Sequence, residues 1–235
     1  MRALEDEFVN RLSRHHLNFG DQLFKLEEFL SVTRIDQAKR ALSQKMRVDR
    51  KRIHRQIGRK VARSITNQMN IARNLGLEIG PKTVVSSYWP VKDELDTRIL
   101  MKALHEEKVI CTLPIMRGKN MALNFRQWKP GDILQEVSFG VSEPTSDKPL
   151  LVPNIILLPL LAVDYEGNRL GYGGGYYDST LLQLRHQSGH RLVAVGLAYE
   201  AQLIPNVPND QSDAKIDWLV TEQNVYQFGS FKTIE

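Results

Sequence analysis

The apolar run at residues 155–163 constrains the fold of this chain more than any other segment. It is too short to cross a bilayer, which takes about 20 apolar residues, and Pro159 interrupts it. Its residues do not alternate between polar and apolar, which is typical of a strand buried on both faces at the centre of a parallel sheet. Residues 155–162 are therefore predicted to form such a strand.

The segments around this run alternate between strand and helix patterns. β-Branched and aromatic residues favour strands, and apolar residues at intervals of three and four favour helices. We predict strands at residues 83–89, 109–113, 121–126, 192–197 and 217–221, and helices at 94–106 and 175–187, the first with Asp93 as its N-cap. Because a strand–helix–strand unit implies a parallel pair, the predicted fold class is α/β: a single three-layer, Rossmann-like domain with a parallel or mixed central sheet.

A long basic segment precedes these strands. Residues 39–63 hold eleven Lys and Arg against one acid, Asp49. Apolar residues recur at intervals of four and seven, which predicts that residues 36–75 form a long N-terminal basic helix, or two joined helices with a break at Gly58. These apolar residues are Ile35, Leu42, Met46, Ile53, Ile57, Val61, Ile65 and Met69. The basic residues suit either an anionic ligand or a solvated helix surface.

The overall composition is that of an ordinary globular protein. The 235 residues are 42% hydrophobic and 25% charged, which is enough for one large domain. The single cysteine, Cys111, forbids an intrachain disulfide or a cysteine metal cluster and is predicted to lie in the core. The N-terminus lacks a secretory or transit pattern, so a cytoplasmic location is expected. Residues 1–35 have poor periodicity and are expected to be a disordered or dispensable extension of an α/β domain at 36–235.

Residues 169–178, Arg-Leu-Gly-Tyr-Gly-Gly-Gly-Tyr-Tyr-Asp, carry the clearest chemical signal. They lie between the apolar strand and a predicted helix, where open α/β sheets bind ligands. Glycines allow positive φ and let backbone N–H groups approach a phosphate at a helix N-terminus. The segment is therefore predicted to bind phosphate, with Arg169 adding a charge-assisted contact. Asp178 would repel phosphate unless a hard cation such as Mg²⁺ lay between them.

Better-known catalytic and phosphate-binding patterns do not fit this chain. The GxGxxG pattern requires glycine where Tyr176 stands, and no Gly-Lys-Ser or Gly-Lys-Thr is present for a Walker A loop. No Ser/His/Asp or Cys/His arrangement is visible, and the histidines lack metal-ligand spacing. None of these patterns therefore assigns a reaction to the chain.

Four motifs of this sequence together resemble those of the 5-formyltetrahydrofolate cyclo-ligase family, also called 5,10-methenyltetrahydrofolate synthetases. The motifs are residues 88–96, 139–144, 153–178 and 207–217. The resemblance extends from about Lys39 to about Thr221. The number of motifs and their order along the chain make it specific.

The resemblance implies an ATP- and Mg²⁺-dependent enzyme that converts 5-formyltetrahydrofolate to 5,10-methenyltetrahydrofolate and releases ADP and phosphate. It implies no protein nucleophile, with Arg169 and Tyr176 as supporting groups in catalysis. It implies that Asp178 and Asp213 are Mg²⁺ ligands. It assigns ATP binding to Lys39, Arg40, Arg169, Leu170, Gly171, Tyr172, Gly173, Gly174, Gly175, Tyr176 and Tyr177, and folate binding to Trp89, Glu94, Tyr172 and Tyr176.

The N-terminal basic motif departs from the family pattern Lys-x-x-Leu-Arg, because Ser43 stands where the second basic residue is expected. Arg40 or Arg47 is a candidate to replace it. Two alternatives stay open: a paralogue that binds a nucleotide and another heterocycle, and an RNA-binding module that uses the basic helix at 39–63. The expected partners are 5-formyltetrahydrofolate and ATP, with no membrane or nucleic acid, and the chain is expected to act as a monomer.

Overall fold

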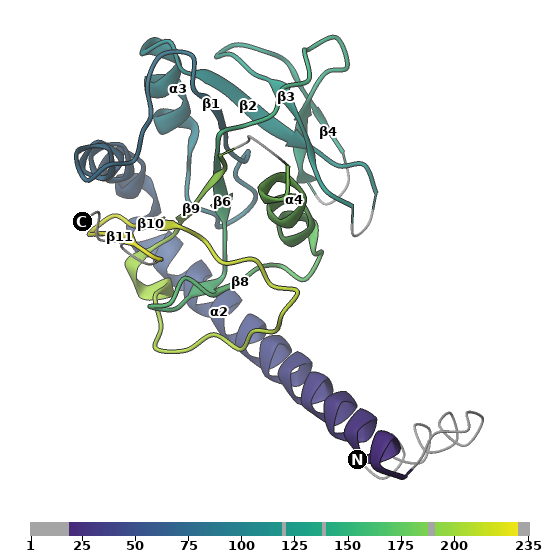
Figure 1. The fold of residues 1–235 in the computed structure, drawn as a ribbon. Coiled ribbons are helices and arrows are strands. Elements are labelled where there is room, and N and C mark those ends of the chain that lie inside the picture. The colour runs from purple at the N-terminus through teal and green to yellow at the C-terminus, as the bar shows by residue number, and fades with distance from the viewer. Residues whose placement is uncertain (1–18, 119–120, 138–139, 188–190, 230–235) are drawn as a thin grey trace, which may run out of the picture.

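A computed structural model describes residues 19–118, 121–137, 140–187 and 191–229 of the chain (Figure 1). Its helices there are α2 (Phe19–Asn74), α3 (Arg98–Glu106) and α4 (Tyr176–Arg185), with the 3₁₀-helix η2 (Glu200–Gln202). Its strands there are β1 (Val84–Ser86), β2 (Ile110–Ile115), β3 (Asn124–Gln127), β4 (Leu134–Glu136), β5 (Ser142–Pro144), β6 (Ile155–Pro159), β7 (Ala162–Val163), β8 (Arg169–Leu170), β9 (Val193–Leu197), β10 (Trp218–Val220) and β11 (Val225–Gln227).

The central sheet has seven strands in the order β11-β10-β9-β6-β1-β2-β3. The strands from β10 to β2 run parallel to their neighbours, and the edge strands β11 and β3 are antiparallel. The apolar strand β6 lies in the middle, between β9 and β1. The predicted α/β class, the mixed sheet and the parallel pair formed by β1 and β2 are therefore confirmed.

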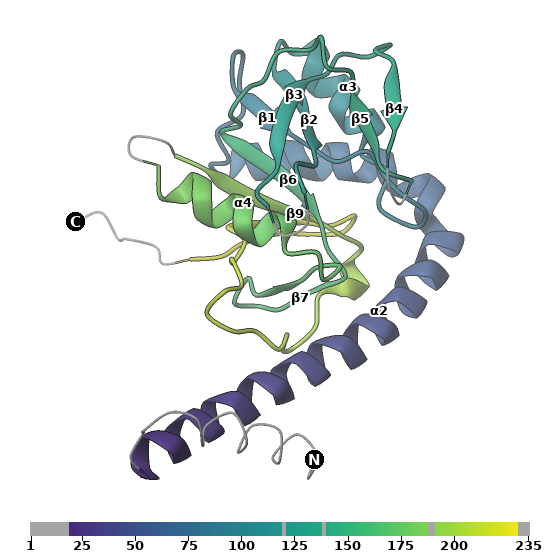
Figure 2. The same cartoon turned by 90° about the vertical axis from the view of Figure 1, so that its right-hand side faces the viewer.

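Both faces of β6 are covered, because successive side chains of a strand point to opposite faces. Leu157 packs in a cluster with Ile65 of α2 and Leu104 of α3. Leu158 packs in a second cluster with Leu181 of α4. Figures 1 and 2 show α4 on one side of the sheet and α2 and α3 on the other, which confirms three layers. Fully burying one such leucine contributes roughly 1.5–3 kcal/mol to stability.

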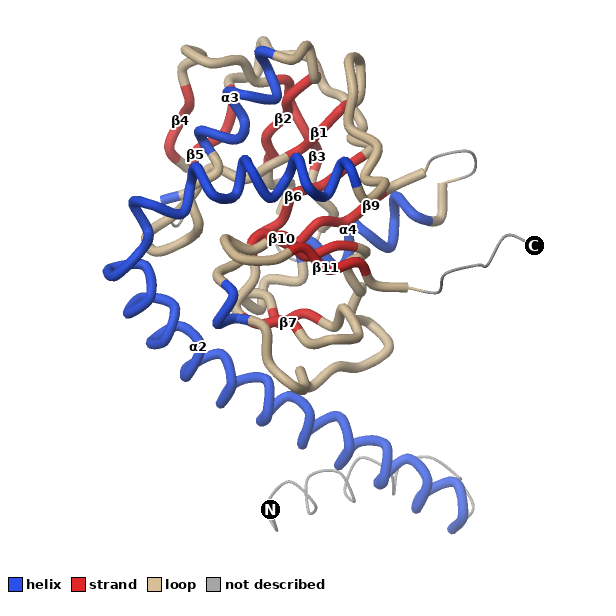
Figure 3. Tube along the Cα trace, turned by 90° about the vertical axis from the view of Figure 1, so that its left-hand side faces the viewer, coloured by secondary structure: helices blue, strands red, loops and turns tan. Residues whose placement is uncertain are grey.

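Helix α2 is continuous over 56 residues and begins at Phe19, earlier than predicted. Several of its predicted apolar positions are fully buried: Ile65 and Met69 pack in the cluster that covers the sheet, and Met46 packs in a separate cluster with Leu170. The helix continues through Gly58 without a break. It is curved along its length, and its N-terminal part projects from the domain (Figures 2 and 3). Neither α2 nor any other described helix is long and apolar enough to span a membrane. Of the expected extension, residues 19–35 continue α2, and residues 1–18 lie outside the described part.

The start of α3 differs from the prediction. The helix begins at Arg98 with Thr97 at its N-cap position, so the predicted N-cap role of Asp93 is wrong. The carboxylate of Asp93 instead accepts a hydrogen bond from Arg50 of α2 at 2.8 Å. A partner 43 residues away has thus replaced the local backbone N–H groups that a capping residue would contact.

Several short strands were not predicted from the sequence. The hairpin of β4 and β5 lies in a segment that was expected to be loop, and β11 was not expected at all. Strand β6 ends at Pro159, and Ala162 belongs to a separate hairpin with β8. Strands of two or three residues are too short to show alternation, so their partners decide whether they form.

Cys111 lies in β2 with 1% of its surface exposed, which confirms its predicted place in the core. Burial raises the pKa of its thiol to about 12. Because the thiolate is the reactive form, this cysteine is inert near neutral pH.

Candidate active site

The glycine-rich residues 171–175 connect β8 to α4, and the chain reaches them from the carboxyl end of β6. Gly173 and Gly175 have φ values of +88° and +64°, and Gly175 is the N-cap residue of α4. A Cβ at Gly173 would meet nothing within 4 Å. The loop thus has an open side, and a helix N-terminus beside it favours an anion.

Arg169 lies against this loop, since a Cβ on Gly171 would come within 3.3 Å of its guanidinium. Its side chain is 2% exposed and donates a hydrogen bond of 2.6 Å to Asp178 Oδ1. Burial lowers the pKa of Arg169, and the nearby charge of Asp178 opposes that shift. Its Nε is buried without a hydrogen-bond partner among the described residues. A charged guanidinium is therefore held beside the glycines by one acid.

Lys39 of α2 reaches a second acidic pair. Its Nζ lies 2.6 Å from Oδ2 of Asp210 and 2.6 Å from Oδ2 of Asp213. Partial burial lowers the pKa of Lys39, but the hydrogen bonds to the two acids outweigh it and the net shift is upward. The hydrogen bond from Lys39 in turn lowers the pKa of Asp210 to about 2. Lys39 and Asp210 are therefore both charged at neutral pH.

Asp178 and Asp213 are brought close together, because the N–H of Ala214 donates to Asp178 Oδ1 at 3.1 Å. Both contacts of Asp178 use that one oxygen. No group of three or more potential metal-ligating side chains occurs among the described residues. Two carboxylates nevertheless suit Mg²⁺, which commonly binds one or two acids together with substrate phosphates and water.

Tyr172 of the glycine loop lies between two arginines of α2. The guanidinium of Arg50, whose residue is 4% exposed, donates to the Tyr172 hydroxyl. The guanidinium carbons of Arg47 and Arg50 each lie 5.2 Å from the centre of the Tyr172 ring, within cation–π range. Arg40, by contrast, is exposed and donates to the backbone carbonyl of Asp36 in its own helix.

Glu94 is 9% exposed and lies in the segment between β1 and α3. Its Oε2 accepts a hydrogen bond of 2.9 Å from the N–H of Val91. Burial raises the pKa of Glu94 to about 7, against the lowering effects of that hydrogen bond and of Arg50. Burial and the Glu94 carboxylate raise the pKa of Tyr177 as well, so the two side chains share one electrostatic environment.

Three other predicted site residues have apolar or aromatic surroundings. The Trp89 ring lies 5.8 Å from the Trp128 ring and 5.9 Å from the Arg98 guanidinium, centre to centre. Tyr176 packs against Gly174, where a Cβ would come within 2.7 Å of its ring. Leu170 is buried in a small cluster with Met46 and Val207.

The structure adds Arg50, Asp93 and Asp210 to the predicted set of site residues. Arg50 is not among the predicted site residues, although it lies eleven positions after Lys39. Eleven residues are close to three turns of a helix, so both side chains lie on the same face of α2. That spacing was a usable signal. The partners Asp93 and Asp210 gave none, since each lies in a loop remote from α2 in sequence.

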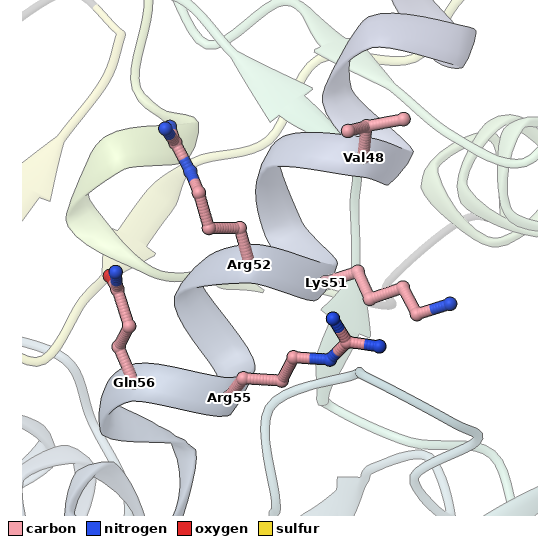
Figure 4. A pocket seen from close by; sticks show the side chains of 5 residues that line it. All are labelled: Val48, Lys51, Arg52, Arg55 and Gln56. Atoms are coloured by element: carbon pink, nitrogen blue, oxygen red, sulfur yellow. The ribbon is translucent and has the colours of Figure 1, made fainter.

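The remaining basic residues of α2 form a different surface. Val48, Lys51, Arg52, Arg55 and Gln56 line an open hollow of about 470 Å³ on the exposed side of the helix. Figure 4 shows Lys51 and Arg55 on one side of the helix and Arg52 and Gln56 on the other. None of these residues belongs to the predicted site, so the basic helix divides into a face that serves the site and a solvated face.

Residues 35–222 of the chain match the model of the 5-formyltetrahydrofolate cyclo-ligase family. The 5-formyltetrahydrofolate cyclo-ligase of Haemophilus influenzae is 31% identical over 137 residues, which are 56% of this chain and 72% of the relative. The Escherichia coli K12 protein of the same name is 30% identical over 140 residues, which are 57% of this chain and 75% of the relative.

Solved structures show the same likeness. The NMR structure of Aquifex aeolicus 5,10-methenyltetrahydrofolate synthetase aligns with a TM-score of 0.67 and 28% identity, over 84% of this chain and 96% of that protein. A 5,10-methenyltetrahydrofolate synthetase from Mycoplasma pneumoniae aligns with a TM-score of 0.59 and 19% identity, over 79% and 99%, which supports the fold.

Proposed function

The chain belongs to the 5-formyltetrahydrofolate cyclo-ligase family, and from that premise we propose that it converts 5-formyltetrahydrofolate to 5,10-methenyltetrahydrofolate in an ATP- and Mg²⁺-dependent reaction. The formyl oxygen attacks the γ-phosphorus of ATP, and ADP leaves. N10 then attacks the activated formyl carbon, loses its proton, and phosphate leaves. The protein supplies position and charge rather than a nucleophile.

The glycine loop is proposed to hold the ATP phosphates. Its open side at Gly173 and the start of α4 offer backbone N–H groups to the phosphate oxygens. Lys39 and Arg169 add positive charge, and each is already held in place by acids. Pre-positioned cations stabilise charge that develops on a transferring phosphoryl group without having to reorganise.

The folate is proposed to bind through Glu94, Trp89, Tyr172 and Tyr176. A carboxylate can accept paired hydrogen bonds from the amino group and ring N–H of a pterin, and Glu94 is a buried carboxylate. The half-buried Trp89 and the tyrosines offer aromatic surface to a flat heterocycle. Burial of Glu94 costs free energy, which is expected for a group kept for recognition rather than for stability.

Asp178 and Asp213 are proposed to hold Mg²⁺ between the protein and the phosphates. The ion would neutralise phosphate charge and allow two acids to remain beside ATP. The side chains of Arg169 and Lys39 form ion pairs with the same two carboxylates.

One observation carries this proposal. The glycine loop, the Arg169–Asp178 ion pair and the Lys39–Asp213 ion pair lie together at one place in the fold. The direct test is incubation of the protein with 5-formyltetrahydrofolate and Mg-ATP, following the absorbance of the methenyl product. Turnover that requires both substrates is expected. ATP binding without any folate turnover would instead favour a paralogue that acts on another heterocycle.

Replacing Asp213 by Asn is expected to raise the Mg²⁺ concentration for half-maximal turnover by about tenfold or more, because an amide is a weaker ligand for a hard cation. Asp210→Asn is the matched control, since Asp210 also pairs with Lys39 but is not assigned to the metal. Each variant loses one ion pair with Lys39, so an effect that both variants show equally comes from the changed surroundings of Lys39. An equal Mg²⁺ requirement in the two variants would remove Asp213 from the metal role.

Removal of residues 1–35 is expected to leave turnover in place. The family match begins at residue 35, and Lys39 is the first proposed site residue. Activity and circular dichroism of the shortened protein are the measurements. A folded protein without turnover would show that the extension contributes to the site.

A further inference from the structure

Arg50 lies where the two proposed substrate-binding segments meet. We propose that it is a positioning residue that couples their binding, so that either substrate, once bound, orders the segment that holds the other. The inference rests on the proposed function, because it takes residues 88–96 as the folate side and the glycine loop as the ATP side. The ring of Tyr172 is also a proposed folate contact, and both variants tested below keep that ring.

Arg50 connects three segments that are far apart in sequence. It comes from α2, and its Nε donates to Asp93 Oδ2 at 2.8 Å, 43 residues away. Another nitrogen of the same guanidinium, Nη1, donates to the hydroxyl of Tyr172, 122 residues away. Asp93 immediately precedes Glu94, and Tyr172 lies within the glycine loop. One side chain therefore contacts both proposed substrate segments.

The two hydrogen bonds of Arg50 differ in how firmly their partners are held. Arg50 is 4% exposed and the Asp93 side chain 17% exposed, so their charge-assisted bond is largely shielded from water and strong. Tyr172 is 37% exposed and belongs to a segment whose glycines restrict the backbone little. The bond to Asp93 is the fixed end, and the bond to Tyr172 is the end that a ligand can order.

A guanidinium is planar, and its nitrogens keep a fixed geometry, so its two arms cannot reorient independently. A nucleotide that orders Tyr172 thereby restrains Arg50, and through Asp93 it restrains the turn that presents Glu94. The first substrate to bind supplies the free energy that orders these segments. The second substrate does not supply it again and therefore binds more tightly. Such coupling is reciprocal and typically amounts to about 5- to 150-fold.

The first test measures the Kd of a non-hydrolysable ATP analogue with and without saturating 5-formyltetrahydrofolate. The folate should tighten nucleotide binding by at least about fivefold in the wild type. It should do so by less than about twofold in Arg50→Lys, which keeps the charge but loses the fork, and in Tyr172→Phe, which loses the hydroxyl. Arg52→Lys is the matched control, because Arg52 is exposed on the same helix, and it should keep the wild-type coupling.

Tyr172→Phe keeps the inference falsifiable if Arg50→Lys does not fold, since it removes one oxygen from a partly exposed side chain. Unchanged coupling in this variant would overturn the inference. Hydrogen exchange gives a second readout: the nucleotide analogue alone should slow exchange of the amides at 91–96 in the wild type but not in Arg50→Lys. Wild-type turnover without any coupling would overturn this inference alone, whereas a wild type that binds neither ligand would overturn the proposed function as well.

Discussion

Glu94→Gln is expected to weaken binding of 5-formyltetrahydrofolate by about tenfold or more and to leave ATP affinity nearly unchanged. The amide keeps the shape of the side chain and can still accept the hydrogen bond from Val91. It turns one acceptor toward the pterin into a donor, and charged hydrogen bonds contribute roughly 1.5–3 kcal/mol each. Equilibrium binding of each ligand to the wild type and the variant is the measurement.

The pH dependence of folate binding should distinguish the same two proteins. Burial raises the pKa of Glu94 from its usual 4.5 to about 7, so below pH 7 most of this side chain is protonated before folate binds. Folate affinity of the wild type should fall by up to about tenfold for each pH unit below that pKa, because the carboxylate is the form that accepts two hydrogen bonds. Glu94→Gln should show no such dependence between pH 5 and 8.

Stability should change in the opposite direction. In the unfolded chain Glu94 ionises near 4.5 and in the folded protein near 7, so the folded state loses stability as the pH rises through this interval. At about 1.4 kcal/mol per unit the loss is about 3 kcal/mol above pH 7. Glu94→Gln should therefore raise the free energy of unfolding at pH 8 but not at pH 4.

In the binding measurements, a Glu94→Gln variant that weakens both ligands equally, or weakens neither, would contradict the folate role of Glu94.

Gly173→Val is expected to weaken ATP binding by about a hundredfold, with a much smaller effect on folate. A β-branched residue at a φ of +88° is strained by on the order of 1–3 kcal/mol. Its side chain would also fill the open side of the loop, where a Cβ now meets nothing within 4 Å, and would keep the backbone N–H groups from the phosphates. Titration with ATP and with folate measures both effects.

Gly76→Val is the matched control for this substitution. Gly76 follows α2, has a φ of +111° and also has nothing within 4 Å of the position of a Cβ. Both variants should lose stability through backbone strain, which thermal unfolding would report. Only Gly173→Val should lose ATP. A similar loss of ATP in both variants would show that the effect is global and not local to the glycine loop.

The central part of the fold was predictable because its signals are local. Consecutive apolar residues in β6 indicated burial on both faces, and the residues on either side of it supplied the covering helices. The glycine loop was recognisable for the same reason, since neighbouring residues indicate both its conformational freedom and its position before a helix. The start of α3 was not, because Arg50 and not the local backbone engages Asp93.

The electrostatic pairing within the site depends on contacts between distant segments. Lys39 and Asp213 are 174 residues apart, and Arg50 and Tyr172 are 122 apart. Helical periodicity could place Lys39 and Arg50 on one face of α2, but not choose their partners among the chain's 27 acids.

The sequence by itself determined the α/β class, the buried central strand, the glycine-rich loop before a helix and the family, because each rests on neighbouring residues or on motifs in a fixed order. Only the tertiary structure decided that Arg50 joins Asp93 to Tyr172, that Lys39 holds Asp210 and Asp213, and that Glu94 is buried enough for its pKa to reach about 7. The physical reason is that ion pairing and desolvation depend on distance in space and on exclusion of water, and neither is a property of the local sequence.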